Sequence, residues 1–193
     1  AGLYPTLFGA VGALFTCFMV IPAVNFCAQK YGKKITFLLS QSVSLVGYIL
    51  LWWGFSPDKP WLMFLPLPLF SFGIGGLFTI MMSMTGDVCD MDELETGKRR
   101  AGTFGAIYWL MVKIGTGLAL MSAGFIMHAI GWDSTAASQT NEALFLLRLS
   151  YIIVPSVGSM LAILVMLNYD LDETKANDIR AQLDARQAAN VAN

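Results

Sequence analysis

Residues 86–102 read GDVCDMDELETGKRRAG, and their charges are acidic in the first half and basic in the second. Glycines bound the stretch at both ends and suit turns, because glycine adopts backbone conformations that other residues avoid. The next run, 103–127, carries a single charge, Lys113. A passive membrane anchor does not need a loop with both charge signs that leads into a helix with a buried lysine. The region is therefore the first place to look for function.

Composition sets the class of the protein around this stretch. Hydrophobic residues make up 56% of the 193 residues and charged residues 13%, whereas a soluble domain carries about 25% charged residues. Five apolar runs are long enough to cross a bilayer, which takes about 20 residues of helix. Barrel strands would be shorter and would alternate, so the runs predict helices. The expected fold is an all-α membrane protein with a bundle over 1–169, a cytoplasmic tail over 170–193, and spans at 3–26, 35–55, 62–85, 103–127 and 143–169.

The placement of basic residues predicts the orientation. Short loops rich in Lys and Arg stay on the cytoplasmic side. The loops at 56–61 and 128–142 carry only Lys59, so they and the N-terminus are expected outside a cell (inner) membrane. An outside N-terminus with an odd number of spans suggests a piece of a longer chain. The basic residues that follow the first, third and fifth runs are Lys30, Lys33, Lys34, Lys98, Arg99, Arg100, Lys175, Arg180 and Arg186.

The charged stretch predicts a conformational switch. Asp87 and Asp90 are three apart and share a face if the preceding helix continues. Further carboxylates come before the basic group Lys98, Arg99 and Arg100. Both signs at the cytoplasmic mouth favour a salt-bridge network that opens and closes. No metal site is expected, because no His or Cys cluster supports one. The lysines of the 30–34 turn are open to two interpretations, topological anchoring or a latch against another part of the protein.

Lys113 carries the sharpest signal. It lies ten residues beyond Thr103, which is about 15 Å into a core of about 30 Å. A lysine at that depth costs about 2.5–3.5 kcal/mol on insertion scales, so it is expected to face a bundle interior or a wet cavity. The alternative is an ion pair that only holds helices together. Trp109, one turn earlier on the same face, is a candidate platform for a sugar ring, although it could equally pack against lipid or a neighbouring helix.

Several other residues leave two interpretations open. The glycine-rich segment 72–76 suits either close helix packing or a helix that bends. Pro22 predicts a tolerated kink near the end of the first span. Arg148, near the outer edge of the fifth span, can snorkel or pair with Glu142.

The motifs resemble those of one transporter family. The stretch 86–100 resembles the A-D-x-x-D-Y-x-E-x-x-T-G-x-R loop of the glycoside–pentoside–hexuronide:cation symporters, which include melibiose permease and belong to the major facilitator superfamily. The turn 31–34 looks like the family's loop between helices eight and nine, and 112–115 looks like its lysine-bearing helix eleven. The segment 169–173 resembles the start of its C-terminal tail. The departures, Gly86, Cys89 and Met91, leave the charges intact.

This resemblance implies helices eight to twelve, the C-terminal half, of a twelve-helix transporter that works by alternating access. It implies cation-coupled symport of a sugar or glycoside, with Lys113 near the substrate and cation sites and the charged stretch in switching. The implied partners are the bilayer, a sugar-like substrate and missing N-terminal helices, with no nucleic acid. No cofactor is expected. The coupling cation, Na⁺ or H⁺, would be bound mostly by carboxylates of the absent half.

Three other classes need to be weighed against this one. An intramembrane enzyme would need a nucleophile with a base, or a metal constellation, at membrane depth, and one lysine does not supply either, so no enzyme is expected. A transporter of lipid or another small solute within the same superfamily is one alternative. A truncated structural remnant without independent activity is the other.

Overall fold

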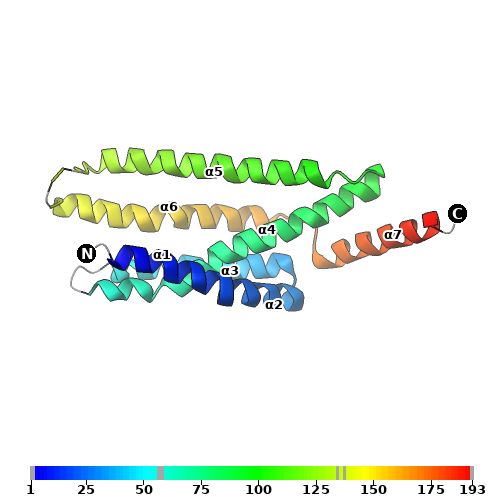
Figure 1. The fold of residues 1–193 in the computed structure, drawn as a ribbon, viewed down its shortest axis with the longest axis horizontal. Coiled ribbons are helices and arrows are strands. Elements are labelled where there is room, and N and C mark those ends of the chain that lie inside the picture. Colours follow the sequence, from blue (N-terminus) through cyan, green and yellow to red (C-terminus); the bar gives the residue numbers. More distant parts are fainter. Residues whose placement is uncertain (1–2, 56–58, 134, 137, 192–193) are drawn as a thin grey trace.

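The computed structural model describes residues 3–55, 59–133, 135–136 and 138–191, and within them every regular element is helical (Figure 1). The predicted turn at 56–60 lies mostly outside the described residues. The elements are α1 (Leu3–Phe15), the π-helix η1 (Thr16–Val20), α2 (Ile21–Tyr31), α3 (Lys33–Gly54), the 3-10 helix η2 (Pro60–Phe64), α4 (Leu67–Thr96), α5 (Ala101–Ala129), α6 (Asn141–Leu167) and α7 (Glu173–Val191).

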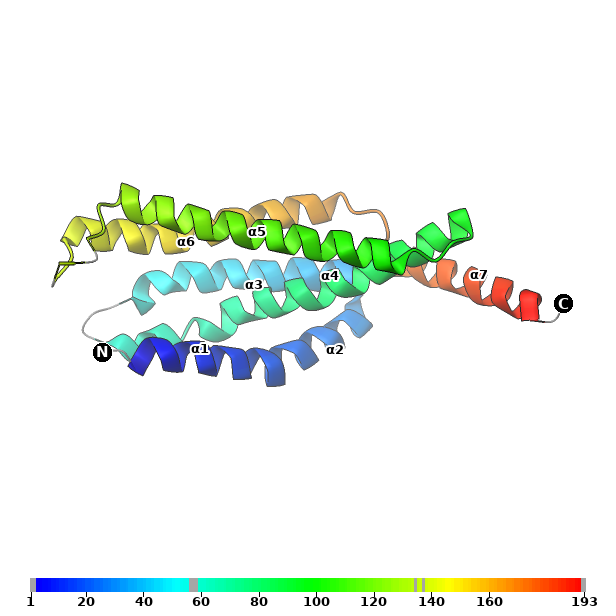
Figure 2. The same cartoon turned by 45° about the horizontal axis from the view of Figure 1, so that its top comes forward.

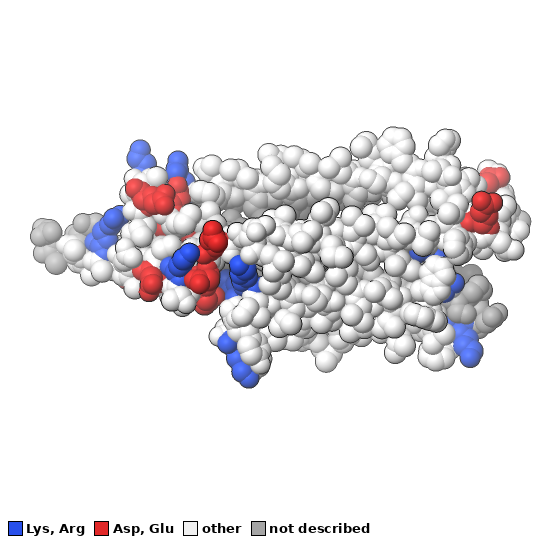
Figure 3. Space-filling model, turned by 180° about the vertical axis from the view of Figure 1, so that it is seen from behind, with Lys and Arg blue, Asp and Glu red and all other residues white. Residues whose placement is uncertain are grey.

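Five helical stretches are long and apolar enough to cross a membrane, which confirms the predicted all-α class and the number of spans. Charge gathers at the two ends of the molecule and leaves a white middle on the face shown in Figure 3. The larger group lies at the end that carries α7 (Figures 1 and 3). The spanning stretches are Leu7–Tyr31, Lys33–Gly54, Trp61–Thr96, Ala101–Ala129 and Asn141–Leu167.

The first span bends where its hydrogen-bond register changes. The five residues of η1 form a π-helix between α1 and α2, and Pro22 follows at the start of α2. Proline has no N–H to donate and its ring clashes with the carbonyl four residues earlier, while π segments kink helices. Thr16 Oγ1 bonds back to the Gly12 carbonyl at 2.8 Å. The helix continues past residue 26 to Tyr31 and carries Lys30 in its last turn.

The tightest helix contact joins α3 to α4 through serines and glycines. A Cβ added at Gly73 would lie 2.4 Å from Ser44 Cβ, and one added at Gly76 would lie 2.6 Å from Ser40 Cβ. Gln41 closes the contact by donating its Nε2–H to the Gly73 carbonyl at 3.0 Å. The glycine-rich segment therefore serves close packing here, as small residues do between membrane helices.

An apolar core extends this contact toward the charged end of the molecule. Its residues come from η1, α2, α3, α4 and α6, and each is at most 4% exposed. Figure 2 shows α3 and α4 lying between the α1–α2 span and α6. This packing supports α4 as far as Met84, just before the residues that bear the charges. The core residues are Val20, Val24, Phe37, Ile80, Met84 and Met166.

Helix α5 is the exception, because none of its residues is buried. It runs antiparallel to α6 in both views (Figures 1 and 2). Tyr108 and Val112 are its half-buried positions nearest the middle. Most of its other residues are exposed within the part of the chain that the structure describes.

Candidate functional site

The charged stretch is mostly helix rather than loop, so the expected loop over 86–102 is wrong for residues 86–96. Helix α4 continues to Thr96 and ends at Gly97, which has φ of +70° and donates its N–H to the Glu93 carbonyl at 2.9 Å. A glycine at this left-handed position is a common helix stop. Gly86 makes no turn, since it lies inside the helix. The continued helix places Asp87 and Asp90 on one face, as their spacing requires.

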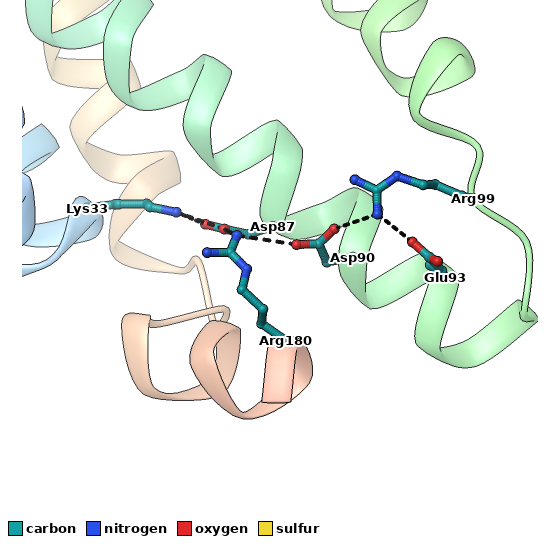
Figure 4. A network of polar contacts seen from close by, with 6 residues as sticks. All are labelled: Lys33, Asp87, Asp90, Glu93, Arg99 and Arg180. Atoms are coloured by element: carbon teal, nitrogen blue, oxygen red, sulfur yellow. Dashed lines mark hydrogen bonds and ion pairs between the residues drawn. The ribbon is translucent and has the colours of Figure 1, made fainter. Parts of the chain in front are cut away.

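Asp87 is the centre of the cluster and is 6% exposed. Lys33, the first residue of α3, donates to both carboxylate oxygens, at 2.7 Å to Oδ1 and 2.5 Å to Oδ2 (Figure 4). Arg180 Nη2 approaches Oδ1 at 3.7 Å. One lysine of the 30–34 turn thus contacts the charged stretch directly, which is the geometry that a latch requires.

Asp90 joins the cluster to the end of α4. It pairs with Arg99 at 3.5 Å and with Arg180 at 3.3 Å, and Arg99 also binds Glu93 at 2.7 Å (Figure 4). The sequence predicts that Asp87 or Asp90 pairs with Arg99 or Arg100, or with a basic group on the missing half, in one state of a transport cycle. Of these pairs, the structure contains Asp90 with Arg99.

The other two residues of the predicted basic group, Lys98 and Arg100, do not pair with Asp87 or Asp90 in the described chain. Arg100 pairs with Asp92 instead, and the contacts of Lys98 within the described chain are made by its backbone with Thr96 Oγ1. The switching role assigned to these residues stays a prediction.

The C-terminal helix supplies the residue that the sequence prediction missed. Arg180 of α7 lies between Asp87 and Asp90, and Arg186 donates to the Leu94 carbonyl at 3.0 Å. Leu183 of the same helix is buried, with 7% of its surface exposed. The spacing of Arg180 and Leu183 puts a basic and an apolar group on one helix face. That signal predicts docking, but it does not name the acidic partner.

The same end of the bundle holds a second lysine contact. Lys34 Nζ donates to the backbone carbonyls of Leu167, at 3.0 Å, and Tyr169, at 2.7 Å. Leu167 is the last residue of α6, where a helix leaves its last acceptors unpaired, and Tyr169 follows the C-cap Asn168. Burial raises the pKa of the Tyr169 phenol, and the charge of Asp87 raises it further. The 33–34 pair therefore ties α3 to both α4 and α6.

The two parts of this network differ in strength. The side chains of Arg99 and Arg180 are 59% and 58% exposed, and exposed pairs contribute only about 0–1 kcal/mol. The Lys33 side chain is 19% exposed and that of Asp87 is 6% exposed. Removing one partner of a buried pair leaves an uncompensated charge, which costs more than an exposed pair is worth. The Lys33–Asp87 contact is thus the strongest single link at this end.

Lys113 and Trp109, the predicted substrate residues, lie on a different part of α5 from the stripe nearest its neighbours. Tyr108 and Val112 mark that stripe, and Lys113 is rotated from Val112 by about 100°. Both predicted residues are exposed, Trp109 to 47%. Within the described residues Lys113 forms no ion pair and faces no interior. The substrate role stays a prediction, and the ion pair that would only hold helices together does not form among the described residues.

A cavity of about 520 Å³ lies between α3, α4, α5 and α6. Its polar groups are those of Gln41, Tyr48 and Ser159, and Gly115 forms part of its wall on α5. A second cavity, of about 390 Å³, lies between α5 and α6 and is lined mainly by apolar side chains, including Ala119, Ala123, Ile126, Leu147 and Val154. The apolar runs in the sequence do not predict either cavity, because both depend on the position of α5 relative to the neighbouring helices.

Comparison with known proteins adds to this geometry. A sequence profile of the family described as "MFS/sugar transport protein" matches residues 2–173. The chain is 30% identical to an uncharacterized symporter of Synechocystis sp., over 84% of this chain and 31% of the relative. It is 27% identical to a glucuronide carrier protein homolog of Escherichia coli, over 86% of this chain and 36% of the relative. It is 24% identical to an isoprimeverose transporter of Lactiplantibacillus pentosus, over 92% of this chain and 37% of the relative. The chain thus spans about a third of the length of these relatives.

Proposed function

Because the chain belongs to the MFS/sugar transport protein family, we propose that it is part of a secondary active transporter that moves a sugar or glycoside together with a cation by alternating access. Membership confirms the resemblance to the symporter family and makes the chain part of a multi-pass membrane transporter rather than an enzyme. The named relatives include a glucuronide carrier homolog and an isoprimeverose transporter, which supports a carbohydrate substrate.

The proposed arrangement places the five spans as helices eight to twelve of the transporter. The chain spans only about a third of the length of these relatives, which supports missing N-terminal helices as the partner. Such transporters bind substrate between two repeats near the midplane. The exposed surface of α5 is suited to line that interface. We place the N-terminus outside the cell (inner) membrane and α7 in the cytoplasm, as the basic loops require.

One observation carries the proposal for the site: Lys113 lies at the midplane of α5, exposed and without an ion-pair partner in the described chain. A charge at that depth is tolerated when it faces a wet cavity or a partner. An ammonium offers three donors to substrate hydroxyls or to a carboxylate of the cation site. Trp109, one turn away, offers a flat apolar face to a sugar ring. The coupling cation in this proposal is Na⁺ or H⁺.

The test is uptake by the complete transporter carrying Lys113→Leu or Lys113→Arg, with membrane abundance measured alongside. We expect Leu to abolish uptake while the protein still inserts, since apolar packing replaces a structural charge without loss. Arg is expected to rescue poorly, because its planar fork differs from a compact ammonium. Lys59→Leu, at the outer end, is the matched control and should leave uptake unchanged. Normal binding and uptake in Lys113→Leu would remove Lys113 from the site.

A second candidate function is transport of a lipid or another small solute within the same superfamily. The apolar cavity between α5 and α6 favours it, because a lateral apolar cleft suits an acyl chain. Competition separates the two candidates: sugars and glycosides should compete for uptake under the first, and lipids under the second. A complete transporter that takes up neither class would leave the chain as a structural remnant.

A further inference from the structure

Arg148 of α6 is a residue for which the sequence leaves two interpretations open, snorkelling or pairing with Glu142. It is seven residues past Asn141, the first residue of α6, so it lies about 10 Å along the helix axis from that end. Within the described residues it forms no ion pair with Glu142. Its guanidinium carbon instead lies 4.5 Å from the centroid of the Trp52 ring on α3.

The aromatic side chains around Arg148 hold the guanidinium in one place. Phe145 of α6 packs edge-on against Trp52, with ring centroids 5.7 Å apart and planes at 90°. The Nε of Arg148 is buried and has no hydrogen-bond partner, whereas its terminal nitrogens are not among the buried unpartnered atoms. The donors that remain reachable therefore belong to the planar end of the side chain.

The Arg148 guanidinium has no anionic partner among the described residues. A guanidinium in apolar surroundings without an anion is costly, and a cation–π contact contributes only about 0.5–2 kcal/mol. The ion pairs of the described chain all lie at the other end, around Asp87, Asp90 and Asp92. The fork of an arginine suits bidentate binding of a phosphate. An oxyanion is the missing partner.

The position of the site identifies the source of that anion. Trp53 and Trp61, 63% and 61% exposed, lie at the same end of the bundle and mark a membrane interface. Arginine side chains at this depth extend to the headgroup level, where the abundant oxyanion is the phospholipid phosphodiester. We propose that Arg148, stacked on Trp52, binds the phosphodiester of a membrane phospholipid at the α3–α6 interface. This site is separate from Lys113 and does not depend on the transport proposal.

The experiment titrates phosphatidylglycerol into the purified full chain and counts bound lipid by native mass spectrometry. Arg148→Gln should weaken the first binding event about tenfold, which corresponds to the lower end of the range for a hydrogen bond to a charged group. The affinity of Arg148→Lys for phosphatidylglycerol should lie between those of the wild type and Arg148→Gln. Lys59→Gln, a charge removed at the same end, is the matched control and should bind as the wild type does. Equal affinity of the Arg148→Gln chain and the wild type would overturn the proposal.

Two further arms identify the ligand group. Monoglucosyldiacylglycerol, which lacks phosphate, should bind the wild type and Arg148→Gln equally, and a loss for this lipid too would mean that the substitution disturbs packing. Inorganic phosphate should not displace phosphatidylglycerol, and full displacement would assign the site to a free anion. Trp52→Phe is the second variant in case Arg148→Gln does not fold, and weaker phosphatidylglycerol binding is expected from it. Unchanged binding in Trp52→Phe would contradict the stacked arrangement.

Discussion

At the scale of single residues, Asp87 stands out because its buried carboxylate pairs with two basic side chains from distant parts of the chain. Lys33 comes from the start of α3 and Arg180 from the C-terminal helix. Neither is close to Asp87 in sequence. A contact of this kind holds one arrangement of three helices, and a state in which the helices separate must break it. The residue is therefore suited to bias a two-state equilibrium by its differential contacts.

Asp87→Asn in the complete transporter should change the transport rate more than the affinity for substrate. The amide keeps the volume but removes the charge that binds Lys33, so the balance between states shifts while the proposed substrate site on α5 is unchanged. Initial rates against substrate concentration separate the two effects. Asp92→Asn is the matched control, because Asp92 pairs with the half-exposed Arg100 and such pairs are worth about 0–1 kcal/mol. An unchanged rate in Asp87→Asn would reduce the cluster to a topology signal.

At the scale of elements, the contact between α3 and α4 depends on the absence of side chains. Gly73 and Gly76 admit Ser44 and Ser40 at distances that no added Cβ could occupy. Gly117 on α5, by contrast, has nothing within 4 Å of an added Cβ. Gly73 and Gly117 both lie in membrane helices, but only Gly117 has room for a side chain, and only the structure distinguishes the two.

Gly73→Ala should destabilise the chain by about 1–3 kcal/mol, the usual cost of overpacking. Gly117→Ala should be neutral or stabilising, because alanine is favoured over glycine in a helix by about 1 kcal/mol. Thermal unfolding of the full chain in one detergent, followed by circular dichroism, compares the two. Removing the Ser44 side chain in Gly73→Ala/Ser44→Gly should recover part of the loss. A Gly73→Ala chain as stable as the wild type would contradict the packing described here.

Sequence reasoning found the helices and missed the contacts between them. Apolar length predicts a span because every backbone group in lipid must be paired within a helix, and that constraint acts on each run separately. It does not say where a helix ends in water, so α4 runs to Thr96 beyond its predicted end at residue 85. The pairing of Asp90 with Arg99 is local and could be predicted. Lys33 and Arg180 meet Asp87 only through the packing of α3 and α7, which no spacing encodes.

At the scale of the whole molecule, the uneven charge at the two ends predicts the orientation in the membrane. A cysteine at position 59 should react with an impermeant thiol reagent in intact cells, and one at position 95 should react only after permeabilisation. Lys and Arg concentrate on the 95 side, and such loops stay in the cytoplasm. The background needs Cys17, Cys27 and Cys89 replaced, since all three are free thiols. Labelling in the reverse pattern would overturn the orientation.

Because α4 is long, a small tilt of this helix moves the charged cluster at its end by several ångströms. The helix is tightly held at Gly76, and Asp90 lies fourteen residues further along it, a lever arm of about 21 Å. A tilt of about 10° about that pivot, a modest rotation for a switching protein, would carry Asp90 through about 4 Å. That displacement is as long as an ion pair can be. The core residues Ile80 and Met84 lie closer to the pivot and would move by only about 1 Å and about 2 Å, so the charges at the tip would separate before the packing in the membrane is lost.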